Sequence, residues 1–139
     1  MYEIRCSFEL TCYQHLSTKP LENILFVGAG AVPVSAIIAS TKGFKVAVVE
    51  RDDKAIVLSK HICSRLGVLI DHVHEDLYNY KEYRAYDLIV ISGKVGVTTK
   101  QKQNIAMHII NNCGNSTILQ QFPASLKIII NQYHTEGAF

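Results

Sequence analysis

The sequence has 139 residues, of which 48% are hydrophobic and 19% charged, with a formal net charge of +2. This length and apolar content fit one domain with a substantial core, and the small charge excess, without a basic run, argues against a nucleic-acid surface. The N-terminus carries no signal-peptide pattern, and the apolar runs are too short to span a membrane. We therefore expect a cytoplasmic protein that binds neither nucleic acid nor a membrane.

The sequence divides into a short polar arm at residues 1–20, which ends in proline, and one predicted domain at residues 21–139, in which strand and helix patterns alternate from Glu22 onwards. Apolar runs of strand length lie at 23–27, 45–50, 69–74, 86–91 and 116–121. Helical patterns lie at 31–40, 53–66 and 98–112, and an apolar segment at 126–132 fits either a helix or a strand. Continuous apolar strands that alternate with helices indicate a parallel sheet covered on both faces. The predicted fold class is α/β, with a Rossmann-like, doubly wound, mainly parallel sheet.

A glycine loop follows the first predicted strand, with Gly28, Ala29 and Gly30 at its turn. Glycine lets the backbone turn tightly and approach a ligand closely, and the helix that follows offers free N–H groups at the positive end of its dipole. A turn without a ligand explains the pattern too. The strand–turn–helix setting nevertheless favours a nucleoside-binding loop.

Three later strand ends add polar groups at the same predicted edge of the sheet. Glu50 ends the second strand, where Rossmann sites place the carboxylate that binds the ribose hydroxyls. Asp76 follows the third strand and is expected either to contact the adenine amino group or to cap the next turn. Ser92 ends the fourth strand. The predicted cofactor-binding residues are Gly28, Ala29, Gly30, Glu50, Arg51, Asp76, Leu77, Ser92 and Gly93.

The third small residue of a dinucleotide fingerprint, GxGxxG/A, is missing. Pro33 stands at that place after Val32. Proline is tolerated early in a helix, but the close packing of a third glycine is absent and no hydride-transfer constellation follows. The sequence therefore favours S-adenosylmethionine over NAD.

The other chemistry-bearing residues have structural explanations beside functional ones. His72 and His74 share one face of a strand, but no further ligand is evident, so no metal site is predicted. Lys94 either holds a carboxylate at the cofactor edge or is an exposed loop lysine. The cysteines fit neither a metal pattern nor a disulfide framework, and packing is favoured over a pocket rim for the tyrosines. These residues are Cys6, Cys12, Cys63 and Cys113, and Tyr78, Tyr80, Tyr83 and Tyr86.

Four segments resemble the nicotianamine synthases: FVGAGAVPVSAI, VAVVERD, YDLIVISGKVGV and KQKQNIAMHIINNC. That family's glycine loop has the form VGxGPLPLT, and its fourth strand runs into a Val-Gly motif. The resemblance extends over residues 22–130 and implies S-adenosylmethionine as a substrate. Its aminocarboxypropyl group would pass to an amine, with release of methylthioadenosine. Residues at matching places are Gly28, Gly30, Pro33, Ser35, Val95 and Gly96.

The sequence also departs from that family. A sizeable helical N-terminal region supplies catalytic acid and tyrosine groups in the family, whereas the arm here is short and Tyr13 is only a weak match. Gln121, Ser125 and Lys127 stand where the family tends to have arginine, glycine and arginine. No catalytic residue is therefore assigned.

The expected function is an S-adenosylmethionine-dependent transferase of nicotianamine synthase type that acts on a small-molecule amine. One alternative is an ordinary methyltransferase, which releases S-adenosylhomocysteine, and another is a non-catalytic cofactor-binding module or subunit. We also expect the sheet to be of the class I methyltransferase type and to lack the usual final strands of that type. The open edge after the fifth strand would then pair with residues 126–130 of a second copy in a homodimer.

Overall fold

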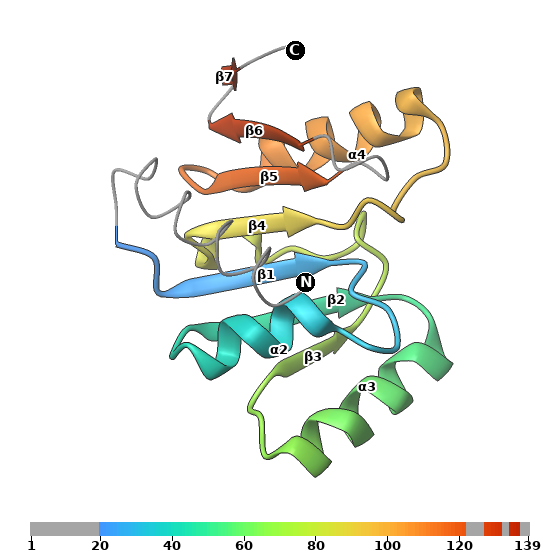
Figure 1. The fold of residues 1–139 in the computed structure, drawn as a ribbon. Coiled ribbons are helices and arrows are strands. Elements are labelled where there is room, and N and C mark those ends of the chain that lie inside the picture. The colour runs from blue at the N-terminus through green and yellow to red at the C-terminus, as the bar shows by residue number, and fades with distance from the viewer. Residues whose placement is uncertain (1–19, 122–126, 132–133, 137–139) are drawn as a thin grey trace.

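A computed structural model describes residues 20–121, 127–131 and 134–136. They form one sheet in the strand order β3-β2-β1-β4-β5-β6-β7 (Figure 1). Strands β1 to β5 are parallel, whereas β6 and β7 pair in antiparallel fashion. The elements are β1 (Asn23–Val27), α2 (Val34–Thr41), β2 (Lys45–Glu50), α3 (Asp53–Leu66), β3 (Asp71–His74), the 3-10 helix η1 (Tyr83–Ala85), β4 (Leu88–Ile91), α4 (Thr99–Asn112), β5 (Thr117–Gln121), β6 (Lys127–Asn131) and β7 (His134–Glu136).

The central strands are buried on both faces, as their continuous apolar sequence predicts. Ile24 and Phe26 of β1 belong to a core cluster with α2 on one face of the sheet. Leu25 and Val27 belong to a second cluster with α4 and η1 on the other face. This three-layer arrangement confirms the predicted α/β Rossmann-like fold.

The helix ends follow local capping rules. Asp52 accepts a hydrogen bond from the N–H of Lys54, and Gly67 takes the left-handed conformation that ends α3 as predicted. Thr98 and Gln101 form a reciprocal capping box at the start of α4. Helix α2 begins three residues later than the predicted helix at 31–40, because Pro33 disfavours helical geometry in the residue before it.

The sheet does not end soon after Gln121, contrary to our expectation. Strand β6 pairs with β5 in antiparallel register, from Thr117 opposite Asn131 to Gln121 opposite Lys127. The edge that we expected a second copy to cover is therefore covered by this same chain. That removes the reason given for a homodimer, and the homodimer itself stays a prediction. The arm at residues 1–20 lies, except for its last residue, outside the described residues, as do Tyr13 and Ser125.

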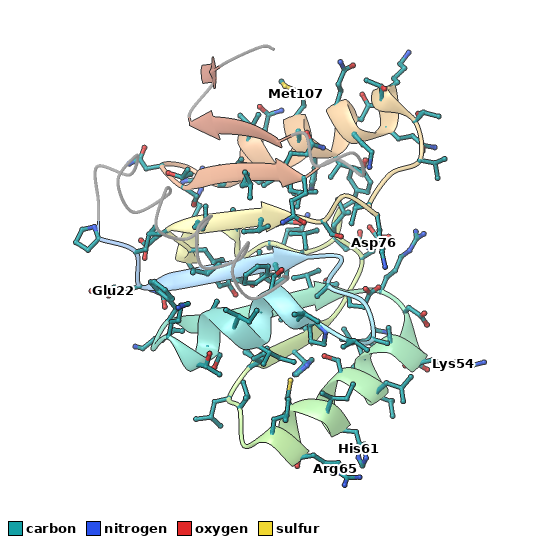
Figure 2. The ribbon with its side chains drawn as sticks, in the orientation of Figure 1. Glu22, Lys54, His61, Arg65, Asp76 and Met107 are labelled. Carbon is teal, nitrogen blue, oxygen red and sulfur yellow. The ribbon has the colours of Figure 1, made fainter. Side chains whose placement is uncertain are left out.

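The strand order places a switch point between β1 and β4. The chain leaves β1 towards β2 on one side, whereas β4 lies on the other side of β1. The chain therefore continues in opposite directions after β1 and after β4 at the carboxyl edge of the sheet, and open α/β sheets bind ligands at such a point. Figure 2 shows Asp76 at this edge and Glu22, which precedes β1, at the opposite edge. No helix among the described residues is long and apolar enough to cross a membrane.

Candidate functional site

The glycine loop after β1 needs glycine at two positions for different reasons. Gly28 and Gly30 have φ angles of 74° and 76°, in the left-handed region that L side chains rarely adopt. A Cβ on Gly28 would lie 2.0 Å from Cγ2 of Val95, whereas a Cβ on Gly30 would meet no atom within 4 Å. The first glycine thus allows close packing against the loop after β4, and the second leaves open space above the turn.

The carboxylate of Glu50 ties the end of β2 to the glycine loop. Its Oε1 accepts a hydrogen bond from the N–H of Gly30 at 2.9 Å, and its Oε2 accepts one from the N–H of Asp52 at 3.1 Å. The N–H of Gly28 adds a bond to the carbonyl of Val49 at 2.9 Å. These contacts orient an anionic acceptor beside the turn before any ligand arrives.

Asp76 both caps a turn and faces Arg51. Its Oδ1 accepts a hydrogen bond from the N–H of Tyr78 at 2.8 Å. Its Oδ2 lies 3.9 Å from a guanidinium nitrogen of Arg51, whose side chain is mostly exposed. An exposed pair at this distance contributes little stability. Both roles that the sequence leaves open for Asp76 are therefore compatible, because the residue caps the turn and also lines a cavity.

Helix α4 holds the loop after β4 through side-chain hydrogen bonds to its backbone. The ammonium of Lys102 donates to the carbonyls of Gly93 at 2.6 Å and Val95 at 3.1 Å, and its side chain is only 5% exposed. The side-chain oxygen of Gln101 accepts hydrogen bonds from the N–H groups of Val97 and Thr98. No functional role was predicted for Lys102 from the sequence. Its position one turn before buried Ile105 and Ala106, on the apolar stripe of α4, was the signal available.

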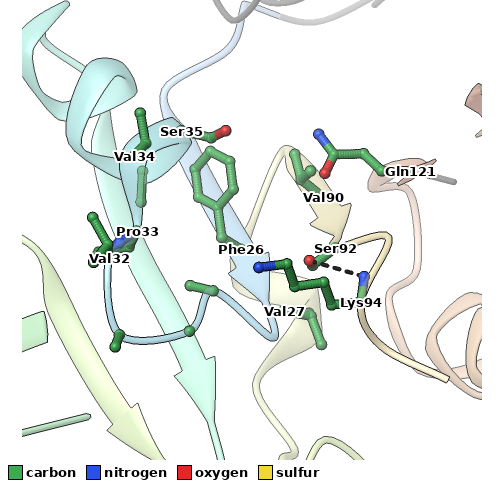
Figure 3. Close-up of a pocket in the computed structure, with 14 residues that line it drawn as sticks. Phe26, Val27, Val32, Pro33, Val34, Ser35, Val90, Ser92, Lys94 and Gln121 are labelled. Carbon is green, nitrogen blue, oxygen red and sulfur yellow. Dashed lines mark hydrogen bonds between the residues drawn. The ribbon is translucent and has the colours of Figure 1, made fainter. Parts of the chain in front are cut away.

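Two adjoining cavities open at this edge and share Val27, Gly30 and Lys94. The larger cavity, of about 590 Å³, lies between the glycine loop and the ends of β2 and β3. The smaller cavity, of about 320 Å³, lies between the glycine loop, the start of α2 and the ends of β4 and β5 (Figure 3). Eight of the nine predicted binding residues line one or both cavities, and Gly93 lines neither. The larger cavity is lined by Gly28, Gly30, Glu50, Arg51, Asp76 and Leu77, and the smaller by Ala29, Gly30 and Ser92.

The two strand histidines have separate partners. Nδ1 of His72 lies 3.1 Å from the carbonyl of Ile70, and Nε2 lies 2.8 Å from Oγ of Ser59. Nε2 of His74 lies 3.0 Å from the carbonyl of Arg51. Within the part of the chain that the structure describes, no group of three or more potential metal ligands is found.

Three of the four tyrosines pack in the interior, as favoured. Tyr80 and Tyr83 are buried with their rings edge to face, and the hydroxyls of Tyr80 and Tyr86 are 2.8 Å apart. Burial raises the pKa of all three phenols, which further disfavours their ionised form. Tyr78 is partly exposed and lines the larger cavity.

The two described cysteines, Cys63 and Cys113, are buried and free. Burial raises the pKa of both thiols. A raised thiol pKa disfavours the thiolate, so neither cysteine is suited to act as a nucleophile. Neither side chain lines either of the two cavities.

Residues 11–132 match the model of the family described as methyltransferase small domain. A search of curated proteins gives no match.

Among solved structures, a mutant of MtNAS in complex with S-adenosylmethionine is similar at 21% identity and a TM-score of 0.69, over 84% of this chain and 45% of that one. The plantazolicin methyltransferase BpumL in complex with SAH is similar at 18% identity and 0.65, over 86% and 46%. TehB from Haemophilus influenzae is similar at 16% identity and 0.62, over 81% and 39%. At these identities the likeness shows the shared fold, and this chain spans less than half the length of each.

Proposed function

Because the chain belongs to the methyltransferase small domain family, we propose that it binds S-adenosylmethionine at the carboxyl edge of its sheet and acts as a transferase that uses it. The observation that carries this proposal is the carboxylate of Glu50, hydrogen-bonded to the glycine loop at Gly30 in the wall of the larger cavity. Family membership and this geometry support the same class of ligand independently.

The hydrogen-bond acceptors of the larger cavity fit an adenosine. The carboxylate of Glu50 would accept hydrogen bonds from the ribose hydroxyls, and that of Asp76 would accept one from the adenine amino group. Leu77 and Ile105 supply apolar surface for the base. The open space at Gly30 leaves room for the chain that joins the nucleoside to its amino-acid tail.

The finer proposal is transfer of the aminocarboxypropyl group to a small-molecule amine. The sulfonium supplies three activated carbons, and the protein selects among them by which one it holds about 3–3.5 Å from the nucleophile. The sequence resemblance at residues 28–33 and at Val95-Gly96 supports this choice. MtNAS, to which this chain is similar in fold, has been solved in complex with MTA and tNA.

Methyl transfer is the competing activity. The family's description and the similarity to a plantazolicin methyltransferase favour it. A methyltransferase of this kind would release S-adenosylhomocysteine, whereas aminocarboxypropyl transfer releases methylthioadenosine. The two activities can share one nucleoside site, because they differ in how the tail and the acceptor are placed.

A binding module without catalysis is the third candidate, and the smaller cavity favours it. Its described lining residues include no carboxylate, imidazole or phenol that could deprotonate an amine. Three residues depart from the nicotianamine synthase pattern, and Gln121 is the one whose side chain the structure describes. It lines this cavity. Catalysis would instead require a general base from elsewhere in the chain or from a partner.

Calorimetric titration followed by product analysis tests these proposals together. The protein is titrated with S-adenosylmethionine, then incubated with it and a panel of amines, and the nucleoside products are identified by mass. Methylthioadenosine supports aminocarboxypropyl transfer, and S-adenosylhomocysteine supports methyl transfer. Binding without either product supports the module. Absence of binding contradicts the proposed function.

A further inference from the structure

The two cavities differ in charge. Acidic side chains dominate the larger cavity, where Arg51 and Lys94 are the described cations. In the smaller cavity Lys94 is the only ionisable side chain among the described lining residues, and the others are apolar or neutral. The carboxylates that line the larger cavity are those of Glu50, Asp52, Glu75 and Asp76.

Lys94 lies where the two cavities join, and its backbone is fixed on both sides. Lys102 holds the carbonyls of the residues before and after it, Gly93 and Val95. The N–H of Lys94 itself donates to Oγ of Ser92 at 3.3 Å. Figure 3 shows its side chain extending from the loop after β4 towards the end of β1. An anchored backbone restricts where the ammonium can reach, although the side chain is exposed.

We infer that Lys94 binds the carboxylate of the amino-acid tail of S-adenosylmethionine in the smaller cavity, an inference that rests on the proposed function. With the nucleoside in the larger, acidic cavity, the tail passes Gly30 and enters the smaller cavity. There the ammonium of Lys94 is the only charged group among the described lining residues. A carboxylate there gains a charge-assisted hydrogen bond and meets no competing anion among the described lining residues. Lys94 would thus give ligands that carry the amino-acid tail a higher affinity than ligands that lack it.

Two nucleosides that differ in the tail test this inference. S-adenosylhomocysteine carries the amino-acid tail, and methylthioadenosine carries the same nucleoside with a methyl group in its place. Both are titrated calorimetrically into the wild-type chain and into Lys94→Met. We expect Lys94→Met to bind S-adenosylhomocysteine about five- to tenfold more weakly, a loss kept modest by solvent exposure. Its affinity for methylthioadenosine should not change.

Two further variants control for charge and for folding. Lys94→Arg keeps the cation and should retain most of the affinity for S-adenosylhomocysteine. Lys60→Met removes one exposed ammonium from α3, away from both cavities, and should bind both nucleosides like the wild type. This control separates a local contact from a change in net charge.

The outcomes that overturn the inference are distinct from those that overturn the proposed function. Unchanged affinity of Lys94→Met for S-adenosylhomocysteine, or an equal loss for both nucleosides, overturns the inference alone. If Lys94→Met instead loses affinity only for a carboxylate-bearing amine titrated in the same way, Lys94 binds the acceptor, and the inference is also overturned. If the wild-type chain binds neither nucleoside, the proposed function fails and the inference fails with it.

Discussion

The two loops that form the site are held in different ways. The glycine loop is fixed by the sheet edge next to it, through Gly28 on Val49 and Gly30 on Glu50. The loop after β4 is fixed by α4, through the hydrogen bonds that the buried ammonium of Lys102 donates to its carbonyls. The first arrangement depends on residues that also line a cavity, whereas the second depends on a side chain that lines neither. Changes in α4 should therefore act on the site from a distance.

The loops meet where Val95 packs on Gly28, and Gly28→Ala should disturb both at once. The added Cβ would lie 2.0 Å from Val95 in a backbone conformation unfavourable to alanine, so we expect a loss of about 3 kcal/mol in the free energy of unfolding. Gly30→Ala shares the positive φ but meets no atom within 4 Å, and it should cost about 1 kcal/mol. Chemical denaturation measures both, and equal losses would contradict the close approach of the loops.

Glu50→Ala should affect ligand binding on the glycine-loop side. Loss of charge-assisted hydrogen bonds to the ribose should weaken binding of S-adenosylhomocysteine and methylthioadenosine alike, by about 1.5–3 kcal/mol. Glu50→Gln keeps one acceptor oxygen and should lose less. Calorimetry that shows unchanged affinity in Glu50→Ala would remove Glu50 from the site.

Lys102→Met tests the loop after β4. Methionine fills much of the space of the lysine stem, but the carbonyls of Gly93 and Val95 lose their shared donor. We expect the free energy of unfolding to fall by about 1–2 kcal/mol and the affinity for S-adenosylhomocysteine to fall as well. Lys100→Met removes an exposed lysine from the same helix and is the matched control, with an expected effect within about 0.5 kcal/mol. If the two variants behave alike, α4 does not hold the loop.

The same difference explains what the sequence could and could not predict. Strands β1 and β2 and helix α3 match their predicted bounds, because apolar runs and capping residues act locally. The position of Glu50 beside the glycine loop follows from parallel strands sharing one carboxyl edge. The contact of Val95 with Gly28 and the return of β6 onto β5 depend on residues distant in sequence, which no local pattern specifies.

A pH titration of stability addresses a region away from both loops. In His72, Nδ1 must donate to the carbonyl of Ile70, so the neutral ring accepts from the hydroxyl of Ser59 through Nε2. Burial is the largest cause that lowers the pKa of His72 from its ordinary value of 6.5, and Lys60 adds to it. The hydrogen bond to Ile70 and the charge of Asp71 oppose the shift.

Because the unfolded chain then binds the proton more readily, the stability that neutral His72 contributes is present above pH 6.5 and is lost as the pH falls through 6.5 towards the lower folded-state pKa. We expect the free energy of unfolding to fall less between about pH 7.5 and 5.5 in His72→Gln than in the wild type. Denaturant titrations at several pH values measure this difference. The other titrating groups contribute equally in both proteins and therefore cancel. Affinity for S-adenosylhomocysteine at neutral pH should be the same in both chains, because His72 lines neither cavity. A loss of affinity in His72→Gln would show that the β3 side of the sheet also positions the site, and that the two loops are not its only supports.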